Sequence, residues 1–304
     1  MSRPAKFRFR RQHHIGAADA EDDKNFLSNC FVDKGDLAIL RDCSDPRTLL
    51  LGRTGTGKTA LILKLDELEE RSINIKPESL SLSYISNSTI VNFLSNIGIN
   101  LDVFYKLLWR HVFAVEIIKL HFGINSDQSL KSFKQKFRNL FMGRKERNAM
   151  RYLEKWGSTF WEATEYRIRE VTKQFENEVK SNVRSIFPSF KFSVDKLGKL
   201  TEQEKAEVIH RAQYVLNNVQ VRQLSDILDL LNDILSDRQK PYFITIDRLD
   251  EGWVEEKLRY KLIRALIETA KEFRRVHNAK IIVAIRQDLL DRVFRLVSIC
   301  CGKQ

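Results

Sequence analysis

The sequence predicts an α/β protein built on a parallel sheet. Three short apolar runs, at residues 48–51, 242–246 and 280–285, have the length and composition of buried strands. Segments with helical spacing of apolar residues lie between them, and strands that alternate with helices usually pair in parallel. Apolar residues make up 43% of the 304 residues, which excludes a globally disordered chain.

The elements follow in order along the chain. After the first apolar run comes a glycine-rich turn, and then an amphipathic helix with Leu61, Leu65 and Leu68 on one stripe. Residues 80–84 read Leu-Ser-Leu-Ser-Tyr, and this alternation predicts a further strand. No proline occurs from Ser88 to Ser185, and apolar residues recur there at helical spacing, so we expect a mostly helical segment. Helices are also predicted after Thr201, over 224–235 and over 257–276.

The glycine-rich turn matches the phosphate-binding P-loop pattern G-x-x-x-x-G-K-[ST] at every fixed position. Its glycines allow backbone N–H groups to wrap a phosphate, and the following helix adds its positive end. The lysine reaches the β- and γ-phosphates, and the threonine hydroxyl is a ligand for Mg²⁺. The predicted nucleotide-binding (Walker A) residues are Gly52, Arg53, Thr54, Gly55, Thr56, Gly57, Lys58 and Thr59.

The second apolar run ends in an acid, as a Walker B strand does. We expect Asp247 to hold Mg²⁺ beside Thr59. Many ATPases place a glutamate directly after this aspartate, but here that position is Arg248. Asp250 and Glu251 follow two residues later, and both are candidates for the general base that polarises the attacking water.

Two arginines complete the predicted site. Arg286 follows the last apolar run, and a residue at the carboxyl end of a parallel strand faces the ligand crevice. It is therefore a candidate sensor of the γ-phosphate or of the acid pair. Arg248 either forms a local salt bridge with Asp250 or Glu251, or acts on a neighbouring subunit of an oligomer.

Residues 52–59, 243–251 and 284–286 together resemble P-loop ATPases of the STAND and AAA+ group, which includes NACHT-type proteins. The opening of the chain and the stretch Asn100 to His111 also resemble a poorly characterised bacterial P-loop ATPase family. The resemblance implies an ATP-driven switch with ATP and Mg²⁺ as cofactors, in a group with some members linked to antiviral defence. It implies catalytic roles for Lys58, Asp247, Asp250, Glu251 and Arg286.

The chain departs from that group in two ways. The group's sheet usually has five strands in the order 5-1-4-3-2, whereas only four are recognisable here, so we expect the order 1-4-3-2 and a C-terminally truncated product. Lys58 and Asp247 are 189 residues apart, which indicates a helical insertion. The predicted organisation is a flexible basic arm (1–15), a first core part (16–90), the helical insertion (91–200) and a second core part (201–304).

Charge distribution bears on the partners. Residues 1–15 carry five basic side chains and no acidic one, and residues 131–192 carry 15 basic against 7 acidic side chains. The central excess makes nucleic acid contact an alternative, but the favoured interpretation is a solvated helix face with its aromatic residues in the core. No apolar run approaches the ~20 residues of a membrane span, and the four cysteines form no C-x-x-C pair, so we expect a cytoplasmic protein that does not contact the membrane.

The expected function is Mg-dependent ATP binding and hydrolysis as a conformational switch in bacterial defence or signalling. The expected partners of the chain are a protein that docks on the helical insertion and further copies of the chain itself. A nucleic-acid-associated ATPase, and a nucleotide-bound switch without turnover, are the alternatives.

Overall fold

The computed structural model describes most of the sheet core and parts of the central segment. The described residues are 30–79, 100–124, 143–156, 227–235 and 240–301, and the single residues 22, 206 and 210. The predicted strand at 80–84, the helix start at Thr201 and much of the expected insertion lie outside them.

Four parallel strands form one sheet in the described part of the chain, and they confirm the predicted α/β class. The order across the sheet is β1-β4-β3-β2, as predicted. All three neighbouring pairs are parallel. The strands are β1 (Leu49–Gly52), β2 (Ser72–Ile75), β3 (Tyr242–Ile246) and β4 (Ala279–Arg286).

The second strand is not the one that the sequence pattern indicated. The strand that pairs with β3 is Ser72–Ile75, which follows helix α3 (Lys58–Leu68) after three residues. The prediction that residues 80–84 supply this strand was wrong. Only Ile75 of β2 is buried, because β2 lies at the edge of the sheet, and so the strand lacks the apolar run of a central one. A short 3-10 turn, η1 (Pro77–Ser79), follows it.

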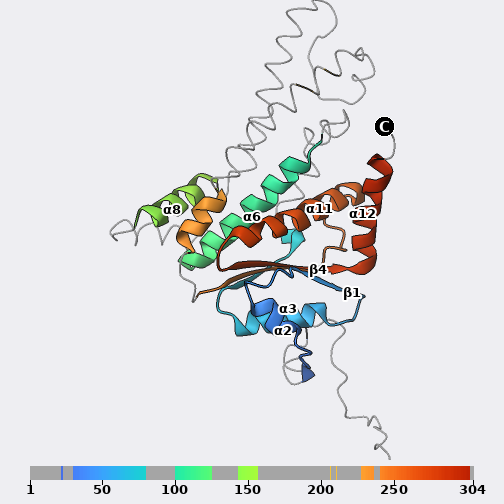
Figure 1. Ribbon diagram of the computed structural model, residues 1–304, viewed down its shortest axis with the longest axis horizontal. Helices are drawn as coiled ribbons and strands as arrows, with labels where there is room; N and C mark the ends of the chain where they lie inside the picture. The colour runs from blue at the N-terminus through green and yellow to red at the C-terminus, as the bar shows by residue number, and fades with distance from the viewer. Residues whose placement is uncertain are drawn as a thin grey trace, which may run out of the picture.

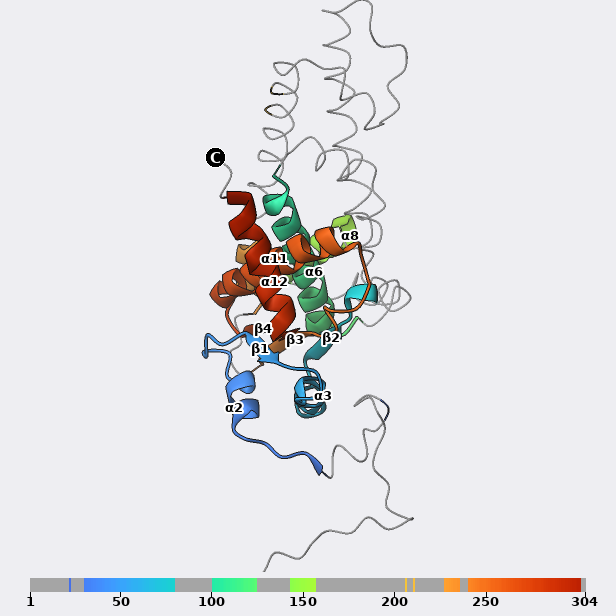
Figure 2. The same ribbon diagram turned by 90° about the vertical axis from the view of Figure 1, so that its right-hand side faces the viewer.

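Helices cover both faces of the sheet (Figures 1 and 2). On one face lie α2 (Asp36–Arg41) and α3. On the other lie α6 (Asp102–Phe122), α11 (Glu256–Glu272) and α12 (Gln287–Cys301). Since each strand turns successive side chains to opposite faces, a central strand here is buried on both sides and is mostly apolar.

Strand β4 shows how the two cores divide. Ile281 and Val283 belong to the larger core beneath α6 and α11, whereas Ile282 packs with Phe243 in the smaller core against α2 and α3. Lys280, the second residue of β4, is buried. Its ammonium donates to the backbone oxygens of Ile39 (2.6 Å) and Asp42 (2.7 Å). It thereby ties the end of α2 to the sheet.

Helix α3 begins at Lys58, as predicted, but only part of its predicted apolar stripe is buried. Leu61 and Leu65 pack in the smaller core. Leu68, the last residue of the helix, is 44% exposed.

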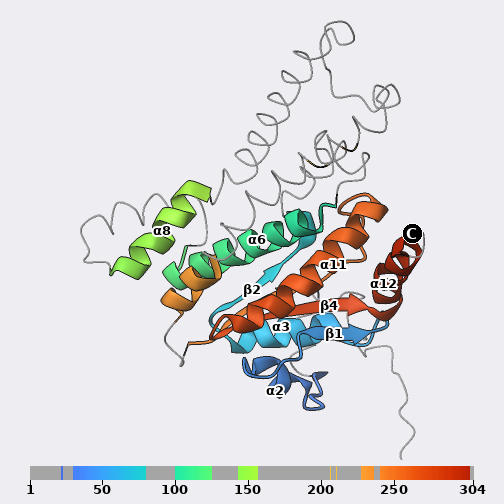
Figure 3. The ribbon, with the colours of Figure 1, turned by 45° about the horizontal axis from the view of Figure 1, so that its top comes forward.

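Helices α6 and α11 lie side by side over the sheet (Figure 3). The Trp109 indole donates to the Leu262 oxygen (2.9 Å), and Arg110 Nε donates to Glu272 (2.8 Å), so polar bonds reinforce the apolar contact. Helix α8 (Arg144–Trp156) joins α6 through a 2.7 Å contact between buried His111 and Tyr152. Residues 227–234 are helical, and η3 (Phe273–Arg275) leads from α11 toward β4. The described part of the central segment therefore packs on the sheet core.

Candidate functional site

Residues 52–59, which match the P-loop sequence pattern and are here called the P-loop turn, join β1 to α3. Gly55 and Gly57 have φ angles of 80° and 87°, a left-handed conformation that costs other residues free energy. The Thr56 hydroxyl and amide both donate to the Arg53 oxygen, at 2.8 and 3.4 Å. A Cβ added at Gly52 would lie 2.4 Å from the Thr56 hydroxyl oxygen, so the close folding of the turn requires glycine there.

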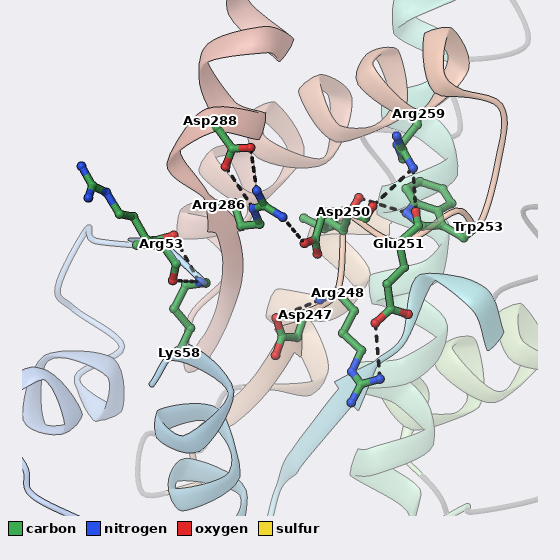
Figure 4. Close-up of polar contacts among 12 residues, drawn as sticks. Arg53, Lys58, Asp247, Arg248, Asp250, Glu251, Trp253, Arg259, Arg286 and Asp288 are labelled. Carbon is green, nitrogen blue, oxygen red and sulfur yellow. Dashed lines mark hydrogen bonds and ion pairs between the residues drawn. The ribbon is translucent and has the colours of Figure 1, made fainter. Parts of the chain in front are cut away.

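The Lys58 side chain folds back over the P-loop turn (Figure 4). Its ammonium donates to the backbone oxygens of Gly52 (3.2 Å) and Arg53 (2.9 Å). The Arg53 side chain points away from Asp247 in the same view. The lysine thus concentrates positive charge inside the turn, whereas Arg53 contributes its backbone.

The carboxyl end of β3 lies against the start of α3. The Thr59 hydroxyl donates to Asp247 Oδ2 at 2.6 Å, which brings together residues that are 188 positions apart in the sequence. Asp247 is only 9% exposed, and its second oxygen accepts from the Arg248 amide at 2.8 Å. The two residues that were predicted to hold Mg²⁺ are therefore in contact.

Residues 247–255, here called the acidic loop, follow β3 and are held by side chains from within and from α11. Arg259 of α11 donates to the backbone oxygens of Glu251 (2.8 Å) and Asp250 (3.4 Å). The Trp253 indole donates to the Leu249 oxygen at 3.3 Å. These bonds fix the backbone that carries the two acids.

The two acids of the loop have different partners. Glu251 forms an ion pair with Arg248 (3.3 Å), one of the two arrangements expected for that arginine. Arg248 itself has a φ of 59°. Burial, and a hydrogen bond with the Glu78 carboxyl of η1 that favours the protonated form of Glu251, raise the pKa of Glu251. Asp250 instead pairs with Arg286 at 3.2 Å.

Arg286 lies at the end of β4, between carboxylates from two elements (Figure 4). Besides Asp250, it contacts Asp288 in the first turn of α12, through Nε (3.0 Å) and Nη2 (2.9 Å). Hydrogen bonds from Arg286 lower the pKa of Asp288. The arginine predicted to face the acid pair therefore does contact one member of that pair.

The structure adds three residues that the sequence patterns did not single out. Glu78 was missed because the strand before it was placed wrongly, at 80–84. Asp288 follows Arg286 by two residues in the first helical turn, where an acid is common for electrostatic reasons alone. Arg259 lies eight residues after Glu251 and acts on backbone oxygens, which no side-chain pattern reveals.

The site contains several carboxylate and hydroxyl oxygens, but they do not form a dense cluster of metal ligands. Within the described ranges, no group of three or more His, Cys, Asp or Glu side chains could hold a metal ion. Nor does any helix described there have the length and apolarity needed to cross a membrane.

The chain has a distant relative among known proteins. The chain is 26% identical over 294 residues to an Escherichia coli (strain K12) protein named "Putative transposon gamma-delta 80.3 kDa protein". The match covers 93% of this chain and 34% of that protein, so the chain spans about a third of its relative's length. No family model and no solved structure matches.

Proposed function

We propose that the chain binds ATP with Mg²⁺ at the P-loop turn and hydrolyses it as a conformational switch. The hydrogen bond between Thr59 and Asp247 carries this proposal, because it joins the P-loop turn to the acid that ends β3. Both lie at the carboxyl edge of a parallel sheet, where α/β proteins bind their ligands.

The chemistry of the turn supports a phosphate ligand. Among the described residues, Lys58 donates to neutral backbone oxygens of the turn, and an anionic phosphate oxygen is a stronger acceptor for its ammonium. The left-handed glycines and the start of α3 supply backbone N–H groups for the remaining phosphate oxygens.

Thr59 and Asp247 fit Mg²⁺ in the proposed site. Both present oxygen, the ligand atom that Mg²⁺ prefers, and Mg²⁺ uses one or two protein ligands together with substrate phosphates and water. Bound there, the ion would supply positive charge that offsets the negative charge of the phosphates. Asp247 is well suited to this role because its carboxylate is nearly buried and faces the Thr59 hydroxyl.

For the hydrolytic step we assign the general base to Glu251. Each acid pairs with one arginine, Glu251 with Arg248 and Asp250 with Arg286. The raised pKa of Glu251, however, brings its carboxylate closer to the basicity that a base needs near neutral pH. Glu251 would accept a proton from water as the water oxygen bonds to the γ-phosphorus. The bond from that phosphorus to the bridging oxygen breaks, and ADP leaves with its electron pair.

The test is Mg-ATP binding and phosphate release by the purified chain, with Lys58→Ala as the variant. Loss of the ammonium is expected to weaken ATP binding by about 100-fold. Lys64→Ala is the matched control, because Lys64 lies on the same helix and its ion-pair partner in the described part of the chain is Glu67. Equal ATP affinity of the wild type and Lys58→Ala would overturn the proposal. Binding without phosphate release would favour the switch without turnover.

A nucleic-acid-associated ATPase is the second candidate, and helix α8 favours it. Arg144, Arg147 and Arg151 recur at helical spacing on its exposed side, and none forms an ion pair with a described residue. The distant relative is named as a transposon protein.

Duplex DNA tests this candidate. Replacement of the three α8 arginines by glutamine should weaken DNA binding. The slope of log affinity against log salt concentration should fall by an amount that corresponds to up to about three phosphate contacts. A triple variant of Lys257, Lys261 and Lys271 to glutamine removes the same charge from exposed positions of α11 and is the control. Equal DNA affinity of both triple variants would exclude a role for α8.

A further inference from the structure

Two carboxylates from different elements hold Arg286. It is the last residue of β4, and α12 begins at the next residue, so its backbone is fixed by the sheet on one side and a helix on the other. Asp288 comes from α12 and Asp250 from the acidic loop.

The two carboxylates occupy different edges of the guanidinium. Asp288 uses both of its oxygens, taking Nε at 3.0 Å and Nη2 at 2.9 Å. This is the bidentate geometry that fixes the plane of an arginine. Asp250 takes Nη1 with a single oxygen at 3.2 Å.

These ion pairs are open to solvent. The side chains of Arg286, Asp250 and Asp288 are 39%, 40% and 51% exposed. Exposed ion pairs contribute little to the stability of a fold. The two parallel bonds to Asp288 therefore serve mainly to orient the Arg286 guanidinium, and add little to the stability of the fold.

We propose that Asp288 is a positioning residue that holds Arg286 by its Nε–Nη2 edge and presents the Nη1 edge to the terminal phosphate of ATP. The inference rests on the proposed function. In the structure the Nη1 edge contacts a single Asp250 oxygen, an anion that a γ-phosphate oxygen can replace. ADP lacks that group, so Asp288 should matter for ATP and not for ADP.

A helix-stabilising role is the competing explanation for Asp288. It lies in the first turn of α12, where a carboxylate interacts favourably with the helix dipole. Asp291 is a control on the same helix. It is exposed, and it accepts from Gln287 at 3.2 Å and not from Arg286.

The experiment compares the affinities of the full chain for ATP and ADP. Asp288→Asn should weaken ATP binding by about tenfold and leave ADP affinity unchanged, because a guanidinium without its anchor no longer stays aligned. Asp291→Asn should change neither affinity. If Asp288→Asn leaves the ratio of ATP to ADP affinity at the wild-type value, the positioning role is wrong while the proposed function stands. If the wild type binds no ATP, both fall.

Arg286→Lys separates positioning from folding. Lysine keeps the charge but cannot form two parallel bonds to one carboxylate. In an Arg286→Lys background, Asp288→Asn should therefore cause no further loss of ATP affinity. The same tenfold loss in both backgrounds would show that Asp288 acts through the helix and would overturn the proposal.

Discussion

The P-loop turn and the acidic loop both lie at the carboxyl edge of the sheet, but different forces shape them. The turn is defined by its backbone, with Gly55 and Gly57 in a left-handed conformation and a lysine bonded to carbonyl oxygens. The acidic loop is defined by side chains, with ion pairs to Arg248 and Arg286 and backbone bonds from Arg259. The conformation of the turn depends on glycines within its own sequence, so it can be read locally. The loop depends also on an ion pair with Arg286, which is distant in sequence and comes close only in the folded chain.

The largest expected effect concerns the acidic loop. If Glu251 is the base, Glu251→Gln should lower phosphate release by about 100-fold or more and leave ATP affinity nearly unchanged. Asp250→Asn is the paired variant and should lower release much less, because in this assignment Asp250 contacts Arg286 and takes no proton from the water. Single-turnover phosphate release measures both. Equal losses in the two variants would contradict the assignment of the base.

The P-loop turn should respond to a single methyl group. Gly52→Ala should destabilise the chain by about 1–3 kcal/mol, because the new Cβ would meet the Thr56 hydroxyl oxygen at 2.4 Å. The same substitution in a Thr56→Ala background should cost less, because the clashing atom is gone. Chemical denaturation measures both costs. Identical costs in the two backgrounds would mean that this contact does not shape the turn.

A smaller effect is expected from the second carboxyl beside Glu251. The charged and titratable groups that influence Glu251 are Arg248, Glu78 and Asp250. Since the Glu78 hydrogen bond raises the pKa of Glu251, Glu78→Gln should lower that pKa. The base would then stay ionised to lower pH, so the acidic limb of the pH–rate profile should move to lower pH. An unmoved limb, or a shift to higher pH, would contradict this contact.

The smallest effect is expected at Arg248. Its φ of 59° is unfavourable for arginine and easy for glycine, whereas its ion pair with Glu251 is partly exposed. Arg248→Gly therefore has opposing effects on stability. It relieves backbone strain in the folded chain, but it removes a weak ion pair and makes the unfolded chain more flexible. The free energy of unfolding should change by less than about 1 kcal/mol. A loss above about 2 kcal/mol would mean that the ion pair holds the loop in place.

The sequence was sufficient for the features that depend on local patterns. Strands β3 and β4 are mostly apolar because both faces of the sheet are covered, and the helix that begins at Lys58 follows directly from the glycine-rich turn. The sequence failed at β2, where four residues with one buried side chain carry a weaker signal than the alternation at 80–84. It also missed Glu78 and Asp288, because their importance comes from the partners that the sheet edge gathers.

The central claim is that the P-loop turn and the acidic loop form one Mg–nucleotide site, and calorimetric titration with ATP tests it most directly. The wild type should bind ATP more tightly with Mg²⁺ than in the presence of EDTA. Asp247→Asn should lose most of that difference, while Asp233→Asn, an exposed acid paired with Lys145, should keep it. ATP affinity that is equal with Mg²⁺ and EDTA in the wild type, or full Mg²⁺ dependence in Asp247→Asn, would contradict the claim.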